Sequence, residues 1–171
     1  MTDAIHIFVG VLAALQPFKA IASDVRFFTL TPDADLVVLL FDDELQDRLH
    51  SRFGTGDWPE NQAANLSTTD QAFAAECSRH GPLAYLQSES EAGATFQSAA
   101  LWQNGALTIG PAALDLGGAN AGRAASLRPI NVALRALGVT ALPARDEAMA
   151  FGLADFTSNA DIRARGWPLR A

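Results

Sequence analysis

The most apolar run in the chain is LVVLLF at residues 36–41, and its length and partial β-branching predict a strand that is buried on both faces. Residues 25–30 form a second apolar segment that predicts a strand. Residues 5–15 are also rich in Ile, Val and Phe and are expected to form a strand, although Gly10 and the neighbouring alanines weaken that pattern. The first 41 residues are therefore expected to supply three strands.

The clearest sheet signal comes from residues 83–110, in which apolar segments alternate with turn sequences. Asn104-Gly105 is the strongest short hairpin signal, because both residue types tolerate the positive φ of a type I′ turn. Residues 91–93 (EAG) predict a second turn. We therefore expect a three-stranded antiparallel meander over residues 83–110, with no helix at residues 95–103.

Helical patterns follow the predicted N-terminal strands. Leu45 and Leu49 lie four residues apart, on one face of a predicted helix that ends near Phe53. Ser67 is followed three residues later by Asp70, a weaker form of the capping box. This pair predicts the start of a second helix.

Two more helices are predicted in the C-terminal part of the chain. Pro129 suits the first turn of a helix that ends at Gly138, and residues 146–153 are expected to form a short fourth helix. Strand clusters separated by helices indicate an α+β fold, with three to four helices on one face of a mostly antiparallel sheet. The length of 171 residues fits a single domain, residues 1–171.

The composition is that of a globular protein, because 49% of the residues are apolar and only 18% are charged. Cys77 is the only cysteine, which excludes an intramolecular disulfide bond. The apolar stretch at residues 7–15 has nine residues, against roughly 20 in a membrane-spanning helix, and no basic residue precedes it as in a secretory signal. We therefore expect a cytoplasmic protein without a membrane partner. Abundant alanine and the use of arginine over lysine are typical of a GC-rich bacterial genome.

The net charge of −7 comes from the N-terminal half of the chain. Residues 1–80 hold twelve acidic and five basic side chains, whereas residues 81–171 hold seven of each. Residues 33–60 alone hold eight acidic and two basic side chains. A negative field repels a phosphate backbone and attracts a basic protein. The charge distribution therefore argues against a nucleic-acid partner and for a basic protein partner.

The acidic segment and its tryptophan are the candidate partner-binding surface. Capping of a helix accounts for Asp42 and Asp43, but it does not account for Asp33, Asp35, Asp57 and Glu60. Aromatic residues are enriched at protein interfaces, which draws attention to Trp58. Solubility is the competing explanation of the charge. The candidate partner-binding residues are Asp43, Glu44, Asp47, Asp57, Trp58 and Glu60.

No catalytic or metal-binding motif is readable in the chain. His6, His50 and His80 are 44 and 30 residues apart, which matches no metal-ligand spacing. Cys77 lies three residues before His80, but it belongs to the apolar stripe of its predicted helix and is expected to be buried. We therefore expect no catalytic residues, no metal and no cofactor, and we favour a protein that is not an enzyme.

An alternative ligand site involves Glu89, Glu91 and Arg123. Glu89 and Glu91 are two residues apart and would share one face of a strand. Arg123 ends a glycine-rich loop, residues 117–123, and could bind an anion. This alternative is a small enzyme or ligand-binding protein with a pocket beside the 83–110 meander. A buried cluster of polar side chains would favour it, whereas an acidic face with exposed aromatics would favour partner binding.

Three parts of the chain resemble a group of uncharacterised small bacterial proteins. They are GPLAYLQSESEAGATFQSAALW with its continuation to residue 110, FDDELQDRLH within residues 36–53, and residues 129–139. These segments carry hairpin and helix residues, so the resemblance implies a fold and brings no activity with it. In size and charge the chain is also similar to the immunity partners of bacterial toxins. The preferred hypothesis is therefore a non-enzymatic acidic protein, like an immunity protein, that binds a basic partner such as a toxic nuclease.

Overall fold

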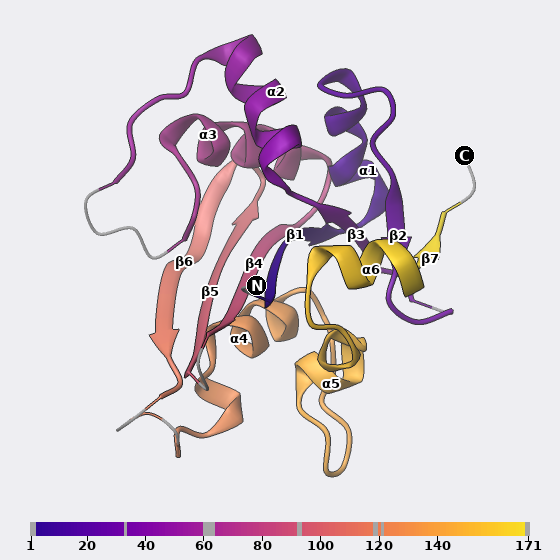
Figure 1. Cartoon of the computed structure of the whole chain (residues 1–171), viewed down its shortest axis with the longest axis vertical. Helices are drawn as coiled ribbons and strands as arrows, with labels where there is room; N and C mark the ends of the chain where they lie inside the picture. Colours follow the sequence, from indigo (N-terminus) through magenta and orange to yellow (C-terminus); the bar gives the residue numbers. More distant parts are fainter. Residues whose placement is uncertain are drawn as a thin grey trace.

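The fold is built on one antiparallel sheet, which Figure 1 shows in a computed structural model. The structure describes residues 3–32, 34–59, 64–91, 94–117, 120 and 122–169. The described residues form seven strands in the order β6-β5-β4-β1-β3-β2-β7, and all neighbouring strands are antiparallel. The strands are β1 (Asp3–Gly10), β2 (Phe27–Thr29), β3 (Val37–Leu40), β4 (Leu83–Glu91), β5 (Ala94–Gln103), β6 (Ala106–Asp115) and β7 (Trp167–Pro168).

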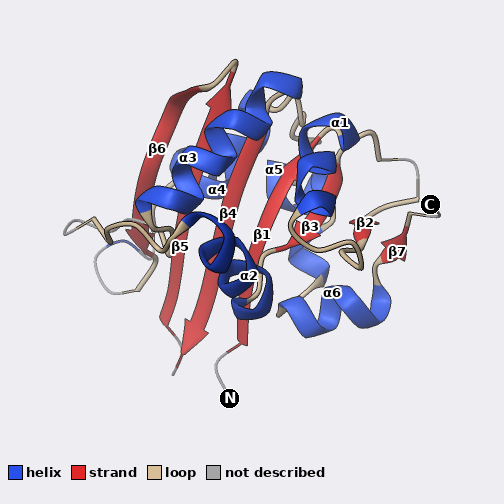
Figure 2. Cartoon of the chain, turned by 90° about the horizontal axis from the view of Figure 1, so that it is seen from above, coloured by secondary structure: helices blue, strands red, loops and turns tan. Residues whose placement is uncertain are grey.

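Helices cover both faces of the sheet, so the molecule has three layers. Figure 2 shows α1, α2 and α3 in front of the sheet, with α4 and α5 behind it. The α-helices are α1 (Leu12–Leu15), α2 (Asp43–Phe53), α3 (Thr68–Cys77), α4 (Pro129–Ala136), α5 (Glu147–Phe151) and α6 (Asn159–Arg165). The short 3-10 helices are η1 (Gln16–Ala20), η2 (Ser78–His80), η4 (Ala125–Leu127) and η5 (Leu153–Asp155).

Alternation along the strands creates two hydrophobic cores. In β1, Phe8 faces α1–α3 and packs against Phe18 and Tyr85 at ring distances of 5.2 and 5.3 Å. Its neighbours Ile7 and Val9 face the opposite core, together with the apolar side of α4. Because both faces of the central strands are covered, their side chains are buried whichever way they point.

Strand β1 is the centre of the sheet, although it begins the chain. It pairs with β4 along its whole length, from Asp3–Ser90 to Gly10–Leu83, but with β3 only from Ile7 onward. Gly10 allows the segment before β4 to approach closely, because a Cβ atom at Gly10 would lie 2.7 Å from the carbonyl oxygen of Pro82. The pairing of β1 with β4 brings residues about 80 positions apart onto one face of the sheet.

The structure confirms the α+β class and the main local signals. The meander is formed by β4, β5 and β6, and Asn104 and Gly105 have φ of 53° and 82° at its second turn. The first predicted turn includes residues 92–93, which lie outside the described residues. Ser67 and Asp70 form the reciprocal capping box of α3, and the segment at residues 36–41 is buried on both faces.

Three expectations were wrong. Helices do not lie on one face, because α4, α5 and α6 cover the side of the sheet opposite to α1–α3. The strand predicted over residues 5–15 ends at Gly10, where the chain turns into α1. The sequence pattern also missed α6, which packs on the α4–α5 side, and β7, which pairs with β2 at the far edge of the sheet. None of the described helices has the length and apolar character needed to cross a membrane.

Candidate functional site

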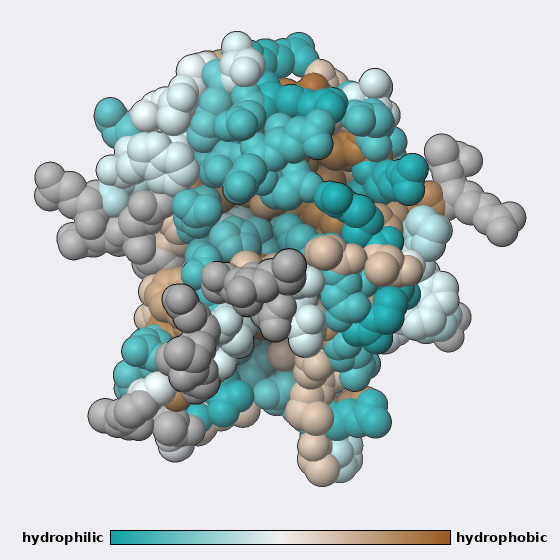
Figure 3. Space-filling view, viewed as in Figure 1, coloured by the Kyte–Doolittle hydropathy of each residue, from teal (hydrophilic) through white to brown (hydrophobic). Residues whose placement is uncertain are grey.

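A stripe of two acidic residues runs along the outer side of α2. Asp43 and Asp47 are exposed, one turn apart, and neither has an ion-pair partner among the residues that the structure describes. Leu45 and Leu49 face the core on the other side of the helix. We call Asp43 and Asp47 the acidic stripe. Figure 3 shows that the surface over α2 is hydrophilic.

The exposed Trp58, in the loop after α2, packs against a residue of that helix. His50, three residues after Asp47 on α2, is mostly buried against Ser67 and Asp70, and the ring of Trp58 packs edge-on against the His50 ring at 6.2 Å. Trp58 nevertheless stays 43% exposed. Two hydrogen bonds to Thr68 hold the main chain of the neighbouring residue Asp57. The loop after α2 therefore presents Trp58 from an anchored segment.

The other candidate partner-binding residues differ in their surroundings. Asp57 is exposed, and among the described residues its carboxylate has no ion-pair partner. Glu44 is engaged by Arg48, with 2.6 Å between Oε1 and Nη2. Glu60 lies outside the described residues. The exposed and unpaired members of the predicted set are thus Asp43, Asp47 and Asp57.

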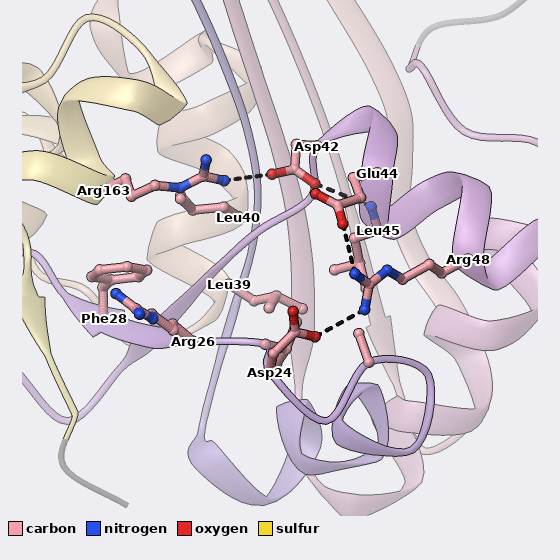
Figure 4. Close-up of a pocket in the computed structure, with 12 residues that line it drawn as sticks. Asp24, Arg26, Phe28, Leu39, Leu40, Asp42, Glu44, Leu45, Arg48 and Arg163 are labelled. Carbon is pink, nitrogen blue, oxygen red and sulfur yellow. Dashed lines mark hydrogen bonds and ion pairs between the residues drawn. The ribbon is translucent and has the colours of Figure 1, made fainter.

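A hollow of about 330 Å³ lies between β2, β3, α2 and Arg163 of α6 (Figure 4). Asp24 and Glu44 both bind Arg48, at 2.9 and 2.6 Å. Asp42, the N-cap residue of α2, binds Arg163 at 2.6 Å. We call this cavity the α2 hollow.

The charges of the α2 hollow balance one another. Three arginines line it against three carboxylates, so the formal sum is zero. Arg26 is exposed and is the only one of the three arginines without an ion-pair partner among the described residues. The ion pairs link the N-terminus of α2 to α6 and to the segment before β2. The ion pairs around the α2 hollow therefore hold elements of the fold together. Because the lining charges balance, the hollow favours neither an anionic nor a cationic ligand.

A chain of partly buried polar groups lies between the sheet and α2–α3. At one end, the His6 ring is held between Tyr85 and Glu89: Tyr85 Oη lies 3.2 Å from Nδ1, and Glu89 Oε1 lies 3.1 Å from Nε2. Burial raises the pKa of the Tyr85 phenol, with smaller contributions from Glu89 and Asp70. The Tyr85 hydroxyl therefore keeps its proton and stays a neutral hydrogen-bonding partner of the His6 ring.

The polar chain continues from Glu89 to the second histidine. Gln87 donates to Glu89 and accepts from the Asn65 main-chain N–H, at 2.7 and 3.0 Å. Gln46 of α2 then donates to both the Asn65 carbonyl and Asp70, at 3.3 and 2.8 Å. These bonds tie α2, α3 and the segment between them to β4, so the polar chain has a clear role in holding the layers together.

Ser67, His50 and Asp70 have the composition of a catalytic triad but not its connections. Both Ser67 Oγ and Asp70 Oδ1 approach the same ring nitrogen, Nε2 of His50, at 3.1 and 2.9 Å. A triad needs the serine and the carboxylate on opposite nitrogens of the ring. Ser67 is also completely buried and accepts the Asp70 main-chain N–H as a helix cap. The cluster is therefore a capping box that α2 closes through His50, and not a nucleophilic site.

Cys77 is buried in the core on the α1–α3 side, as its place in the apolar stripe predicts. Burial, and secondarily the charge of Glu76, raises the pKa of its thiol to about 12. His80 lies in η2 and is exposed. A thiol with this pKa is inert as a nucleophile near neutral pH. Among the described residues, no three His, Cys, Asp or Glu side chains are grouped as metal ligands.

The alternative ligand residues stand in separate places. Glu89 is occupied by His6 and Gln87 on the α1–α3 face of the sheet. The side chain of Glu91 lies outside the described part of the chain, and Arg123 is exposed in the segment before η4. Within the described residues no contact joins Glu89 to Arg123.

A pocket does lie beside the meander, but other residues form it. It has a volume of about 320 Å³ and is on the α4–α5 face of the sheet, so we call it the α4 pocket. Ser88 of β4 and Gln97 of β5 contribute the meander's part of its lining. Arg128 and Asp146, the N-cap residues of α4 and α5, line the pocket together with apolar side chains.

Sequence reasoning missed the polar chain and the α4 pocket for one reason. His6 approaches Glu89 because β1 pairs with β4, in a register that places Ala4 opposite Glu89 and Phe8 opposite Tyr85. No local signal reports such a pairing. The alternation along β1 predicts that His6 and Phe8 lie on the same face of the sheet, but it does not predict that β4 is the strand beside them.

Comparisons of the chain with protein-family models, with curated protein sequences and with solved structures found no match. The resemblance to uncharacterised small bacterial proteins therefore stays a prediction. Arguments about function depend on the geometry described above.

Proposed function

We propose that the protein is a non-enzymatic binding protein that docks a basic protein partner through the acidic stripe and Trp58. The observation that carries this proposal is that α2 exposes two unpaired carboxylates, Asp43 and Asp47, while the ring of Trp58, 43% exposed, packs against His50 of the same helix. Trp is enriched at protein interfaces and their hot spots, and complementary charge speeds association and excludes wrong partners.

Folding alone gives little reason to keep the stripe. Like charges four residues apart on a helix destabilise it by about 0.2–0.5 kcal/mol. Asp43 gains some compensation from the helix dipole in the first turn, but Asp47 lies beyond that turn. Glu44, in contrast, is paired with Arg48. The unpaired carboxylates are thus available to a partner, while their neighbour stabilises the fold.

The chemistry of the surface defines the partner. A surface rich in Lys and Arg would be steered toward the stripe, and a pocket for an aromatic ring would receive Trp58. Nucleic-acid-binding proteins carry such basic surfaces, because they must neutralise phosphates. An immunity-like role, in which this chain covers the basic surface of a nuclease, is the most concrete form of the proposal.

Affinity capture from the source organism, followed by mass spectrometry, tests this role. The wild-type chain would be compared with Asp43→Asn/Asp47→Asn and with Trp58→Ala. A matched control, Asp115→Asn/Asp155→Asn, removes the same charge from two exposed residues outside the acidic segment. The proposal predicts a basic protein that both surface variants lose and the control keeps. A partner retained equally by all four chains would reject the acidic stripe as the docking surface.

A further inference from the structure

The α4 pocket is lined by one row of residues across three strands and by the ends of two helices. Ile5, Ser88 and Gln97 are paired neighbours in β1, β4 and β5, so their side chains stand side by side on the same face. Ile130 of α4 and Phe156 add buried apolar walls. A volume of about 320 Å³ lies within the range of roughly 300–1,000 Å³ that small-molecule sites occupy.

Two lining residues carry polar atoms that the fold leaves unsatisfied. Arg128 Nε, a donor, and Gln97 Oε1, an acceptor, are buried and have no hydrogen-bond partner among the described residues. Buried polar groups are nearly always paired, because an unpaired one costs stability. The pocket therefore offers one donor and one acceptor that a ligand with the opposite groups would satisfy.

Charges of both signs flank these atoms. Arg128 is the N-cap residue of α4, which has no acidic residue in its first turn, so the guanidinium and the helix dipole both favour an anion here. The Asp146 carboxylate also lines the pocket, and Asn131 Nδ2 and the Met149 main-chain N–H hold it at 3.1 and 2.9 Å. A cationic group would be accepted beside it.

We propose that the α4 pocket binds a small apolar α-amino acid. The carboxylate of the ligand meets Arg128 at the N-terminus of α4, and its ammonium group donates to Gln97 Oε1 and Asp146. Its side chain packs against Ile5 and Phe156. The pocket lies on the sheet face opposite to the acidic stripe, so this proposal does not depend on partner docking.

Calorimetry and thermal unfolding with L-leucine at millimolar concentration test the assignment. Leucinol lacks the carboxylate and 4-methylpentanoate lacks the amine, so each analogue removes one group that the pocket is expected to recognise. We expect L-leucine to raise Tm saturably and both analogues to bind about tenfold or more weakly, since each loses a charged hydrogen bond. No shift with L-leucine would overturn the proposal, as would equal binding of either analogue.

A pair of arginine variants locates the binding in the chain. Arg128→Gln removes the charge at the pocket, whereas Arg123→Gln removes the same charge from an exposed residue that does not line it. L-leucine should bind Arg128→Gln about tenfold or more weakly and Arg123→Gln as it binds wild type. Unchanged binding to a folded Arg128→Gln variant would place the ligand elsewhere and overturn the assignment.

Discussion

Asn159 binds both main-chain polar groups of His6, a residue 153 positions earlier in the chain. Its Oδ1 accepts from the His6 N–H and its Nδ2 donates to the His6 carbonyl, each at 2.9 Å. The pairing register of β1 with β3 begins at Ile7, and the main-chain N–H of Phe41, directly after β3, also donates to the His6 carbonyl at 2.9 Å. The Asn159 side chain of α6 therefore provides an acceptor for the His6 N–H and a second donor to the His6 carbonyl where the pairing of β1 with β3 ends.

Replacing Asn159 by Ala should destabilise the protein by about 1–3 kcal/mol, because the His6 N–H would lose its partner in a half-buried position. Urea unfolding measures the loss, and hydrogen exchange at the His6 amide should become faster. The exposed neighbour Thr157→Ala is the control and should change the free energy of unfolding by less than about 0.5 kcal/mol. Equal effects of the two substitutions would show that the hydrogen bonds of Asn159 to His6 do not stabilise the fold.

Ser67→Ala should lower the free energy of unfolding by about 0.5–2 kcal/mol, because the N-cap of α3 and its link to His50 are lost. Ser51→Ala, on the exposed side of α2, is the control. A fluorophosphonate probe should label neither protein, since Ser67 is buried and both Ser67 and Asp70 approach the same nitrogen of His50. Labelling of wild type that disappears in Ser67→Ala would mean that the cluster is a nucleophilic site after all.

The Cys77 thiol should resist alkylation in the folded protein. Its pKa is raised to about 12 by burial, so very little thiolate exists at pH 8 and the sulfur is also shielded from solvent. Iodoacetamide should modify the native chain far more slowly than the urea-unfolded chain, with mass spectrometry as the measurement. A native rate close to the unfolded rate would show that the α1–α3 core opens readily at Cys77.

Asp161 should contribute a stability that disappears in acid. The hydrogen bond from Arg165, and secondarily that from the Thr157 main chain, lowers the pKa of the Asp161 carboxyl below its ordinary 3.8. A carboxyl with a lowered folded pKa stabilises the protein above its unfolded pKa and loses that contribution as pH falls through the folded value. The stability gap between wild type and Asp161→Asn should thus be full at neutral pH and shrink below pH 3.8. A gap that stays constant down to pH 2 would contradict this origin.

Local chemistry made part of the fold predictable. The capping box of Ser67 and Asp70 and the turn at Asn104-Gly105 depend on residues a few positions apart, and both occur as the sequence indicates. The apolar run at residues 36–41 also indicated a strand buried on both faces. That prediction already implied a second layer of helices, so the one-face expectation conflicted with it.

The long-range arrangement was beyond the reach of local patterns. The position of β1 between β3 and β4 depends on strand pairing between distant parts of the chain. That pairing is stabilised by side chains of β1 that pack into both hydrophobic cores. For the same reason the His6–Glu89 contact and the α4 pocket could not be predicted, whereas the exposure of Asp43 and Asp47 followed from the positions of Leu45 and Leu49 on the same helix.

The association kinetics of the captured partner test the docking surface most directly. Stopped-flow measurements would compare wild type, Asp43→Asn/Asp47→Asn and the control Asp115→Asn/Asp155→Asn at low and at physiological salt. We expect the wild-type association rate to fall steeply with added salt, and the stripe variant to associate about tenfold more slowly at low salt with little remaining salt dependence. The control should follow wild type. A folded stripe variant that associates at low salt as fast as wild type would contradict the account and leave the acidic stripe as a solvated surface.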